Sequence, residues 1–190
     1  MLASAGNDLA PSGKAYGLIH TSQLRGTNAM STPDKTETDT KPLRLLVPIN
    51  ANEDSRWGIQ YAMRRHREGT QTDVILLNIG EPITQWEVLR FRTQQEIDQF
   101  QLERAQAFIE GASLLLAQDD IPCRGLFKQG ELIFTILDTA EELDCDEIVM
   151  PAPSTWLSDL FSCGVVSTML HQQRGIPLVV VNSEGIIKKP

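Results

Sequence analysis

The sequence lacks long apolar runs, a cysteine framework and an excess of basic residues. No apolar stretch among the 190 residues approaches the ~18 that a membrane-spanning helix needs, so no membrane partner is predicted. Three cysteines, at positions 123, 145 and 163, are too few and too irregularly spaced for a disulfide framework or a zinc cluster, which favours a reducing compartment and a cytoplasmic protein. The 17 Lys and Arg against 25 Asp and Glu give a net charge of −8, which argues against general nucleic-acid binding.

The first 42 residues differ in composition from the rest of the chain. They contain no Val, Phe or Trp, and ten of them are Ser or Thr. Such a segment cannot bury enough apolar surface to offset the entropy lost on ordering. We therefore predict a disordered leader over residues 1–42, with residues 1–29 as an extension before Met30, and a folded domain over residues 43–190. The leader shows neither the apolar stretch of a secretory signal nor the arginine content of a transit peptide.

Short apolar runs alternate with amphipathic segments from residue 43 onward. The runs are rich in Val, Ile and Leu, as is typical of parallel strands buried on both faces, and they cover residues 43–50, 73–80, 123–130, 146–150 and 176–182. Apolar spacing between them predicts helices near 52–69, 81–120 and 131–143, and another from residue 164. Asn52 is expected to cap the first of these helices. This order predicts an α/β fold: an open five-stranded parallel sheet with helices on both faces.

In an open parallel sheet, ligands bind outside the carboxyl ends of the strands, where the strand order reverses. Three segments here follow such strand ends, at residues 48–50, 78–80 and 150–168. The sequence contains neither a G-x-S-x-G elbow nor a G-x-x-x-x-G-K-[ST] loop, which disfavours a hydrolase or a phosphate-loop enzyme. A binding site without catalytic residues is the expectation that fits these segments best.

The order and spacing of several motifs resemble the universal stress protein family. The motifs are LLVPIN followed by SRWGIQYA, then Gly130-Glu131, DEIVM and the closing IPLVVV, and they span residues 43 to about 183. The resemblance implies a Rossmann-like fold of the adenine nucleotide alpha hydrolase type. It also implies a role in stress tolerance and regulation, no general catalytic activity, and a homodimer paired through the last strand.

Many members of that family bind ATP through the pattern G-x2-G-x9-G-[ST]. The first two glycines would let the backbone approach ribose and phosphate, and the third opens a helix whose free amides face the phosphates. By the resemblance, the four defined positions fall here on Pro151, Ser154, Gly164 and Val165. Only Gly164 matches, and Asn50 stands where ATP-binding relatives usually carry an Asp. The resemblance therefore points to the A-type subgroup that does not bind ATP.

We interpret the corresponding crevice as a vestigial nucleotide site. Its candidate residues come from three strand ends and from the start of the last predicted helix: Pro48, Ile49, Asn50, Ile79, Met150, Pro151, Ser154, Gly164, Val165, Val166 and Ser167. No cofactor and no metal are expected. ATP or AMP held by the amides at that helix start is the alternative.

The loop between positions 154 and 164 carries large apolar residues where nucleotide-binding relatives tend to have basic and small ones. These residues are Trp156, Leu157, Leu160 and Phe161. They can fold back and fill the unused pocket, as apolar side chains usually do. They can also form an exposed patch that binds a protein partner or an apolar ligand.

The last predicted strand would leave an apolar edge unpaired, which proteins usually avoid. We expect two chains to pair there through Val179, Val180 and Val181. Together these observations predict a homodimeric, non-catalytic regulator or scaffold of the stress response. An ATP- or AMP-binding switch with little or no hydrolysis is the alternative. A pyrophosphatase-type ligase is disfavoured, because NANED at 50–54 is not the Ser/Gly-rich loop that such enzymes carry after the first strand.

Overall fold

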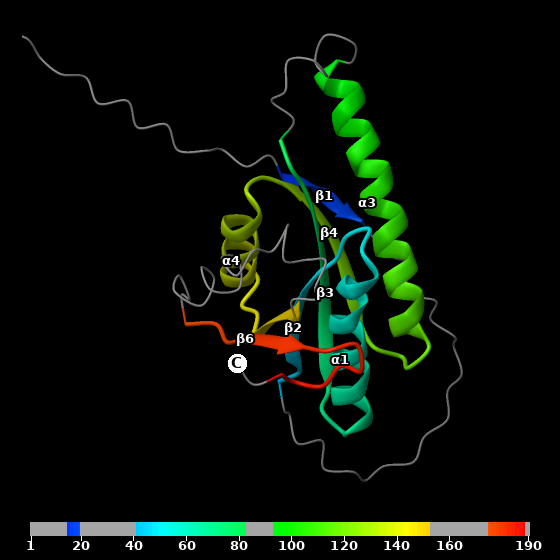
Figure 1. Ribbon diagram of the computed structural model, residues 1–190, viewed down its shortest axis with the longest axis vertical. Helices are drawn as coiled ribbons and strands as arrows, with labels where there is room; N and C mark the ends of the chain where they lie inside the picture. The colour runs from blue at the N-terminus through cyan, green and yellow to red at the C-terminus, as the bar shows by residue number, and fades with distance from the viewer. Residues whose placement is uncertain (1–14, 20–40, 83–92, 153–174, 189–190) are drawn as a thin grey trace, which may run out of the picture.

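The computed structural model describes residues 15–19, 41–82, 93–152 and 175–188 (Figure 1). Within these ranges the strands form one sheet in the order β1-β4-β3-β2-β5-β6. Their bounds are β1 Ala15–Ile19, β2 Leu43–Pro48, β3 Thr72–Gly80, β4 Cys123–Gln129, β5 Glu147–Pro151 and β6 Leu178–Val181. Strands β2 to β6 run parallel to one another, which confirms the predicted five-stranded parallel sheet.

Helices cover both faces of this sheet. Helix α1 (Trp57–Arg67) and helix α3 (Gln94–Ala117) lie on one face, and helix α4 (Leu132–Glu142) lies on the other (Figure 1). The helix predicted from residue 164 lies outside the described residues. None of the helices built from the described residues combines the length and the apolar character required to span a bilayer.

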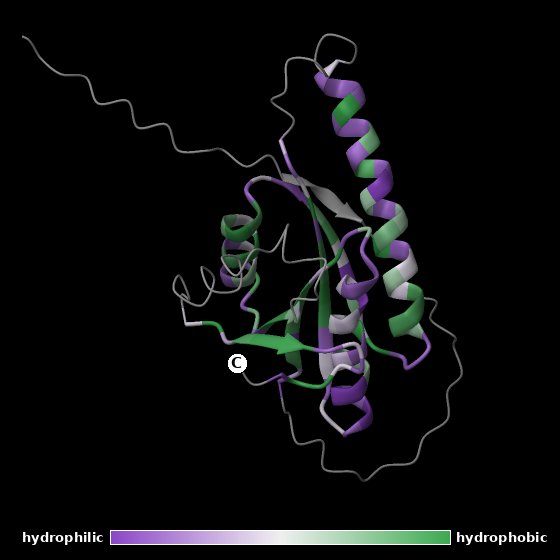
Figure 2. Cartoon of the chain, in the orientation of Figure 1, coloured by the Kyte–Doolittle hydropathy of each residue, from purple (hydrophilic) through white to green (hydrophobic). Residues whose placement is uncertain are grey.

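The central strands are apolar on both sides because each side faces a helix layer. In β2, Leu45 and Val47 pack into the core cluster beneath α1 and α3, while Leu46 packs into the cluster beneath α4. In Figure 2 the central strands are largely green, whereas α1 and α3 carry many purple, hydrophilic positions on their surfaces. Alternate side chains of a strand point to opposite faces, so two buried faces require a continuous apolar run.

The segment that leads into α1 differs from the prediction in its first turn. Residues Glu53–Arg56 form a short 3₁₀ turn, η1, and the Asn52 side chain makes no capping hydrogen bond. The main chain of Asn52 is used instead, because its carbonyl accepts bonds from the Ser55 N–H at 3.1 Å and from the Ser55 hydroxyl at 2.7 Å. Ser55 therefore closes the turn that Asn52 was expected to close.

Strand β1 was not predicted. It pairs antiparallel with β4, with Ala15 opposite Lys128 and Tyr16 opposite Phe127. The prediction of a leader without regular structure is therefore wrong for residues 15–19, and residues 1–14 and 20–40 lie outside the described ranges. Composition failed here because an edge strand pairs through backbone N–H and C=O groups, which a polar segment also carries.

The strand order reverses between β2 and β5. From the central β2 the chain adds β3 and β4 on one side, and then crosses to add β5 and β6 on the other. A crevice at the carboxyl ends of these two strands is the expected ligand position of such a sheet.

Candidate functional site

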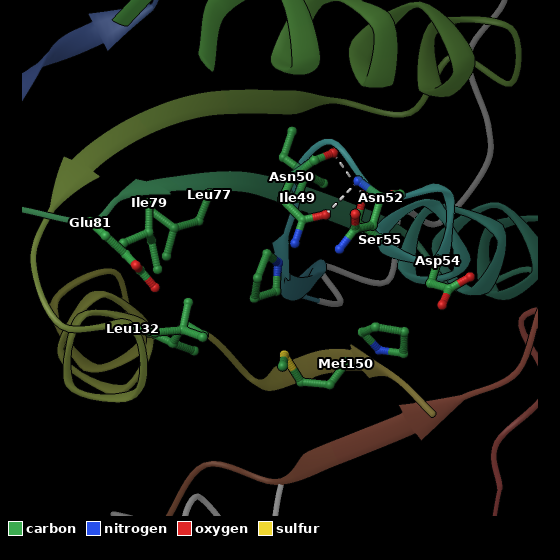
Figure 3. A pocket seen from close by; sticks show the side chains of 13 residues that line it. Ile49, Asn50, Asn52, Asp54, Ser55, Leu77, Ile79, Glu81, Leu132 and Met150 are labelled. Carbon is green, nitrogen blue, oxygen red and sulfur yellow. Dashed lines mark hydrogen bonds between the residues drawn. The ribbon is translucent and has the colours of Figure 1, made fainter. Parts of the chain in front are cut away.

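A crevice of about 210 Å³ opens at the carboxyl ends of β2, β3 and β5 (Figure 3). Its walls come from the segment after β2, the end of β3, the first turns of α4 and the end of β5. The lining residues are Pro48, Ile49, Asn50, Asn52, Asp54, Ser55, Leu77, Ile79, Glu81, Leu132, Ile136, Met150 and Pro151. The volume enclosed by these described walls is smaller than the ~300–1,000 Å³ of typical ligand pockets.

The crevice opens where the pairing of β2 with β5 stops. These strands pair only at Leu45 with Glu147 and at Leu46 with Ile148. On their other sides, β2 stays paired with β3 as far as Pro48, and β5 stays paired with β6 as far as Pro151. The gap is therefore local to the junction between β2 and β5.

Two prolines account for this gap. Successive residues of a parallel strand turn their N–H groups to opposite neighbours. The Ile49 N–H donates to Leu77 of β3 at 2.8 Å, and the Ala152 N–H donates to Val181 of β6 at 2.7 Å. The preceding residues, Pro48 and Pro151, are therefore the ones turned toward the junction. Because proline has no N–H, neither can extend the ladder or donate a hydrogen bond into the crevice.

The segment after β2 is held by its own polar groups. The Asn50 Oδ1 accepts a bond from the Asn52 N–H at 2.8 Å, and the Ser55 hydroxyl donates to the Asn50 carbonyl at 3.2 Å (Figure 3). From β3, the buried Asn78 amide donates to the Ile49 carbonyl at 2.8 Å. Asn50, the expected counterpart of the family's adenine-binding Asp, thus serves a local turn in this structure.

The charged groups that line the crevice are both acidic. Asp54, with 8 % of its surface exposed, lies at one side, and Glu81 follows β3 at another (Figure 3). None of the described lining residues is Lys, Arg or His. The rest of the lining is largely apolar, from Ile79, Leu132 and Met150 among others. Such a crevice favours apolar groups and hydrogen-bond donors over anions.

The structure brings together part of the predicted set. Pro48, Ile49, Asn50, Ile79, Met150 and Pro151 all line the crevice. The other candidates lie outside the described residues, as do the apolar loop residues; they are Ser154, Trp156, Leu157, Leu160, Phe161, Gly164, Val165, Val166 and Ser167.

Several lining residues were not predicted. They are Asn52, Asp54, Ser55, Leu77, Glu81, Leu132 and Ile136. Leu132 and Ile136 are four residues apart at the start of a predicted helix, a spacing that places both on one face. That signal marks a buried face, but it does not say that the face reaches the end of β2. Within the described ranges no three His, Cys, Asp or Glu side chains group as metal ligands would.

Ionisable groups with shifted pKa values gather at the opposite, amino ends of the strands. Burial, and then a 2.9 Å hydrogen bond from its hydroxyl to Glu147, raise the pKa of Tyr61 to about 12. Burial raises the pKa of Cys145 to about 11 and also raises the pKa of Cys123. The Arg44 N–H bonded to Asp146 lowers the pKa of that carboxyl group.

The fold defines an open α/β protein with a crevice at the point where its strand order reverses. Residues 43–182 match the sequence profile of the Universal stress protein family, and the chain belongs to that family. None of the curated proteins matches the sequence significantly.

Solved structures with the same fold include three from this family. The first, from Burkholderia pseudomallei, has a TM-score of 0.57 and 11 % identity over 73 % of this chain and 95 % of that one. The second, from Arabidopsis thaliana with AMP bound, has a TM-score of 0.53 and 13 % identity over 74 % and 92 %. The third, a universal stress protein in complex with cAMP, has a TM-score of 0.52 and 12 % identity over 76 % and 99 %. At such identities the likeness shows the fold alone.

Proposed function

We propose that this chain is a cytoplasmic, dimeric and non-catalytic regulator or scaffold of the stress response whose crevice does not hold ATP. The observation that carries the proposal is the pair of prolines at the junction of β2 and β5. Phosphate groups bind where several backbone N–H groups converge. Pro48 and Pro151 leave both strand ends without a donor at the residues turned toward the crevice.

The charge of the crevice supports the same proposal. Asp54 and Glu81 both line it, and none of the described lining residues is Lys, Arg or His. A triphosphate would therefore find no cationic side chain among the described lining residues.

A nucleotide with fewer phosphates is the second candidate. Two proteins with this fold were solved with AMP and with cAMP. The apolar walls formed by Ile49, Ile79 and Met150 suit a flat aromatic base. A switch that binds AMP or ATP with little or no hydrolysis therefore stands as the alternative to the proposed scaffold.

A thermal-shift titration of the full chain with ATP, ADP and AMP, each with magnesium, separates the two candidates. A ligand that binds only the folded state must raise the melting temperature. We expect no shift with ATP up to about 1 mM, since RT ln(1 + [L]/Kd) is then close to zero. A shift of several degrees with sub-millimolar ATP would overturn the proposal, and a shift with AMP alone would establish the alternative.

A variant with four substitutions serves as the matched positive control. Asn50→Asp, Pro151→Gly, Ser154→Gly and Val165→Ser together return the family's ATP-binding pattern to this chain. We expect this variant to gain an ATP-dependent shift that the natural sequence lacks. Replacing Gly164 with a bulky residue in this variant should then remove that shift. Light scattering on the unmodified chain tests the proposed dimer separately.

A further inference from the structure

Helix α3 carries apolar residues on two opposite sides. Its inner side packs into the core through Ile109 and Leu116, which are fully buried. Phe100 and Leu114 lie on the outer side, where they are 58 % and 69 % exposed. Helices α1 and α4 concentrate their apolar residues on one side more strongly. In Figure 2, green positions accordingly recur among the purple ones along α3. The outer side of α3 therefore offers apolar surface that its own core does not use.

The outer apolar residues of α3 recur every seven residues. They are Phe100, Ala107 and Leu114, which we call the outer seam, and all three are exposed. Seven residues make almost two full turns, so the three side chains follow one line along the helix. At ~1.5 Å per residue the seam is roughly 20 Å long. A repeat of this length is the one by which a helix packs along another helix.

The shape of the outer seam suits a second helix. Ala107 separates the two large side chains, Phe100 and Leu114, and Gly111 lies one turn beyond it. A Cβ built at Gly111 would meet nothing within 4 Å. How closely two helices approach depends on the size of the side chains between them. Small residues at the middle of the seam therefore allow a close approach there.

Phe100 is held in place although it is exposed. The Arg104 guanidinium carbon lies 5.5 Å from the centroid of the Phe100 ring and 5.8 Å from that of Phe108. The attraction between the cation and the two rings restricts all three side chains. A side chain that is ordered before binding loses less entropy when a partner binds.

Carboxylates follow one edge of the outer seam. Glu103 and Glu110 are exposed, and each follows a seam residue, Phe100 or Ala107, by three positions. A shallow hollow of about 500 Å³ adjoins Phe100, and Glu103 also lines it. Arg104 is the single basic residue of α3. An apolar seam with an acidic edge is complementary to a helix that carries basic residues beside its apolar side.

We propose that the outer seam of α3 is a docking surface for an amphipathic helix of a partner protein, with Lys or Arg beside its apolar side. A second copy of the chain fits less well, because each copy would bring Glu103 and Glu110 against one guanidinium, which is stacked on Phe100. An anionic membrane would repel the same two carboxylates. The proposal goes beyond the function proposed above and depends on neither the crevice nor the dimer.

The probe is a fluorescent peptide of three heptads with Leu at positions a and d and Lys at e and g, the lysine peptide. A matched glutamate peptide carries Glu in place of each Lys. Fluorescence anisotropy with the full chain gives both dissociation constants. We expect the lysine peptide to bind at least about tenfold more tightly, because its charges oppose those of the seam edge. Equal affinities, or no binding of either peptide, would overturn the proposal.

Phe100→Gln combined with Leu114→Gln removes the apolar ends of the seam. Both side chains are exposed, so the melting temperature should stay unchanged, whereas the lysine peptide should bind at least about tenfold more weakly. Ile187→Gln is the matched control, since Ile187 is 53 % exposed and lies outside α3. It should leave the dissociation constant unchanged. Equal weakening in the two variants would overturn the proposal, because any exposed apolar residue would then serve.

Glu103→Lys combined with Glu110→Lys reverses the charge of the seam edge. The lysine peptide should then bind least and the glutamate peptide should bind in its place. Asp138→Lys combined with Glu184→Lys is the control, because it changes the net charge equally at exposed positions outside α3. This control should keep the preference for the lysine peptide. A preference reversed in both variants would show general attraction to an acidic chain and would overturn the proposal.

A photoreactive residue at the centre of the lysine peptide locates the site without any substitution in the protein. It should crosslink to residues 100–114, and a crosslink elsewhere would overturn the proposal. Self-association of the unmodified chain, or its binding to phosphatidylserine vesicles, would overturn it too if the Phe100 and Leu114 double variant abolished that association or binding. Each of these results leaves open whether the crevice binds ATP, so failure here is distinguishable from failure of the proposed function.

Discussion

The two ends of the parallel sheet are built in opposite ways. At the amino ends, the Arg44 guanidinium donates to Asp73 at 3.0 Å and to the Leu143 carbonyl at 2.9 Å. The Arg44 N–H also donates to Asp146 at 2.8 Å, and this bond joins β2 to the start of β5. At the carboxyl ends, the same two strands separate at Pro48 and Pro151. One junction is closed by paired polar groups and the other is kept open.

The closed junction at the amino ends contributes to stability, whereas the open junction at the carboxyl ends forms the crevice. Hydrogen bonds to charged groups that are partly withdrawn from water contribute more than exposed ones. A crevice, by contrast, requires that backbone pairing stop. We therefore expect substitution of Arg44 at the amino ends to change the free energy of unfolding most, and substitution of the two crevice prolines to change it least.

The largest effect is expected for Arg44→Ala. It leaves Asp73 and the Leu143 carbonyl without their donor, in a pair whose side chains are only 28 % and 20 % exposed. The free energy of unfolding should fall by about 2–3 kcal/mol in urea denaturation at pH 7. Arg64→Ala is the control, since Arg64 and Glu68 are each 48 % exposed, and it should cost within about 0.5 kcal/mol. Equal losses would contradict the comparison.

Asn78→Ala tests the one buried side-chain bond described beside the crevice. Removing its amide leaves the Ile49 carbonyl without a partner 2.8 Å away, so we expect a loss of about 1–2 kcal/mol. Amide exchange over residues 49–55 should accelerate as well. Gln99→Ala, which removes a bond to Glu103 on the exposed side of α3, should cost within about 0.5 kcal/mol. A Gln99 variant as unstable as the Asn78 variant would refute the role of burial.

Tyr61→Phe should cost about 1 kcal/mol at pH 7, since it removes the hydrogen bond to Glu147. Because the native pKa of Tyr61 is raised from 10.0 to about 12, the unfolded chain releases this proton first as pH rises. Wild-type stability should therefore decline between about pH 10 and 12, and the variant should lack that part of the decline. Urea denaturation at several alkaline pH values measures this decline in the free energy of unfolding. An equal decline in the wild type and in Tyr61→Phe would contradict the raised pKa of Tyr61.

Asp146→Asn should act on the acid side of the pH profile. The Arg44 N–H lowers the native pKa of Asp146 below its ordinary 3.8. A lowered native pKa contributes stability above the unfolded value, and that stability is lost as pH falls through the native one. The variant should therefore lose less stability than the wild type below about pH 4. If acid unfolding followed by circular dichroism is identical for the wild type and the variant, the bond between Arg44 and Asp146 does not contribute to stability.

The smallest change in stability is expected for Pro48→Val combined with Pro151→Val. Two recovered N–H groups could extend the ladder between β2 and β5, but the proline constraint on the unfolded chain is lost. We expect a net change below about 1 kcal/mol, with new amide protection at positions 48 and 151. Pro122→Val, placed before the amino end of β4, should add no protection at the crevice. Rapid exchange at both new amides would mean that something other than the prolines holds the strands apart.

Local patterns predicted the parallel fold well. The runs predicted at residues 43–50, 73–80 and 123–130 form strands because a sheet covered on both faces demands continuous apolar sequence. The candidate site was predicted in part. Ile49, Ile79 and Met150 follow from the general position of ligands in such sheets, whereas Asp54, Glu81 and Leu132 come from turns and helices whose approach no spacing specifies.

The sequence by itself determined the elements of the parallel sheet, because side-chain hydropathy repeats with the period of each element. Its match to the family profile over residues 43–182 determined the family. The sequence also shows that positions 48 and 151 are prolines. Only the tertiary structure decided that these prolines face one junction, because register depends on which strands become neighbours. The coverings of the sheet edges, β1 on β4 and residues 182–188 on β6, were likewise decided there. They form through backbone groups that every residue but proline carries in full, so composition could not distinguish them.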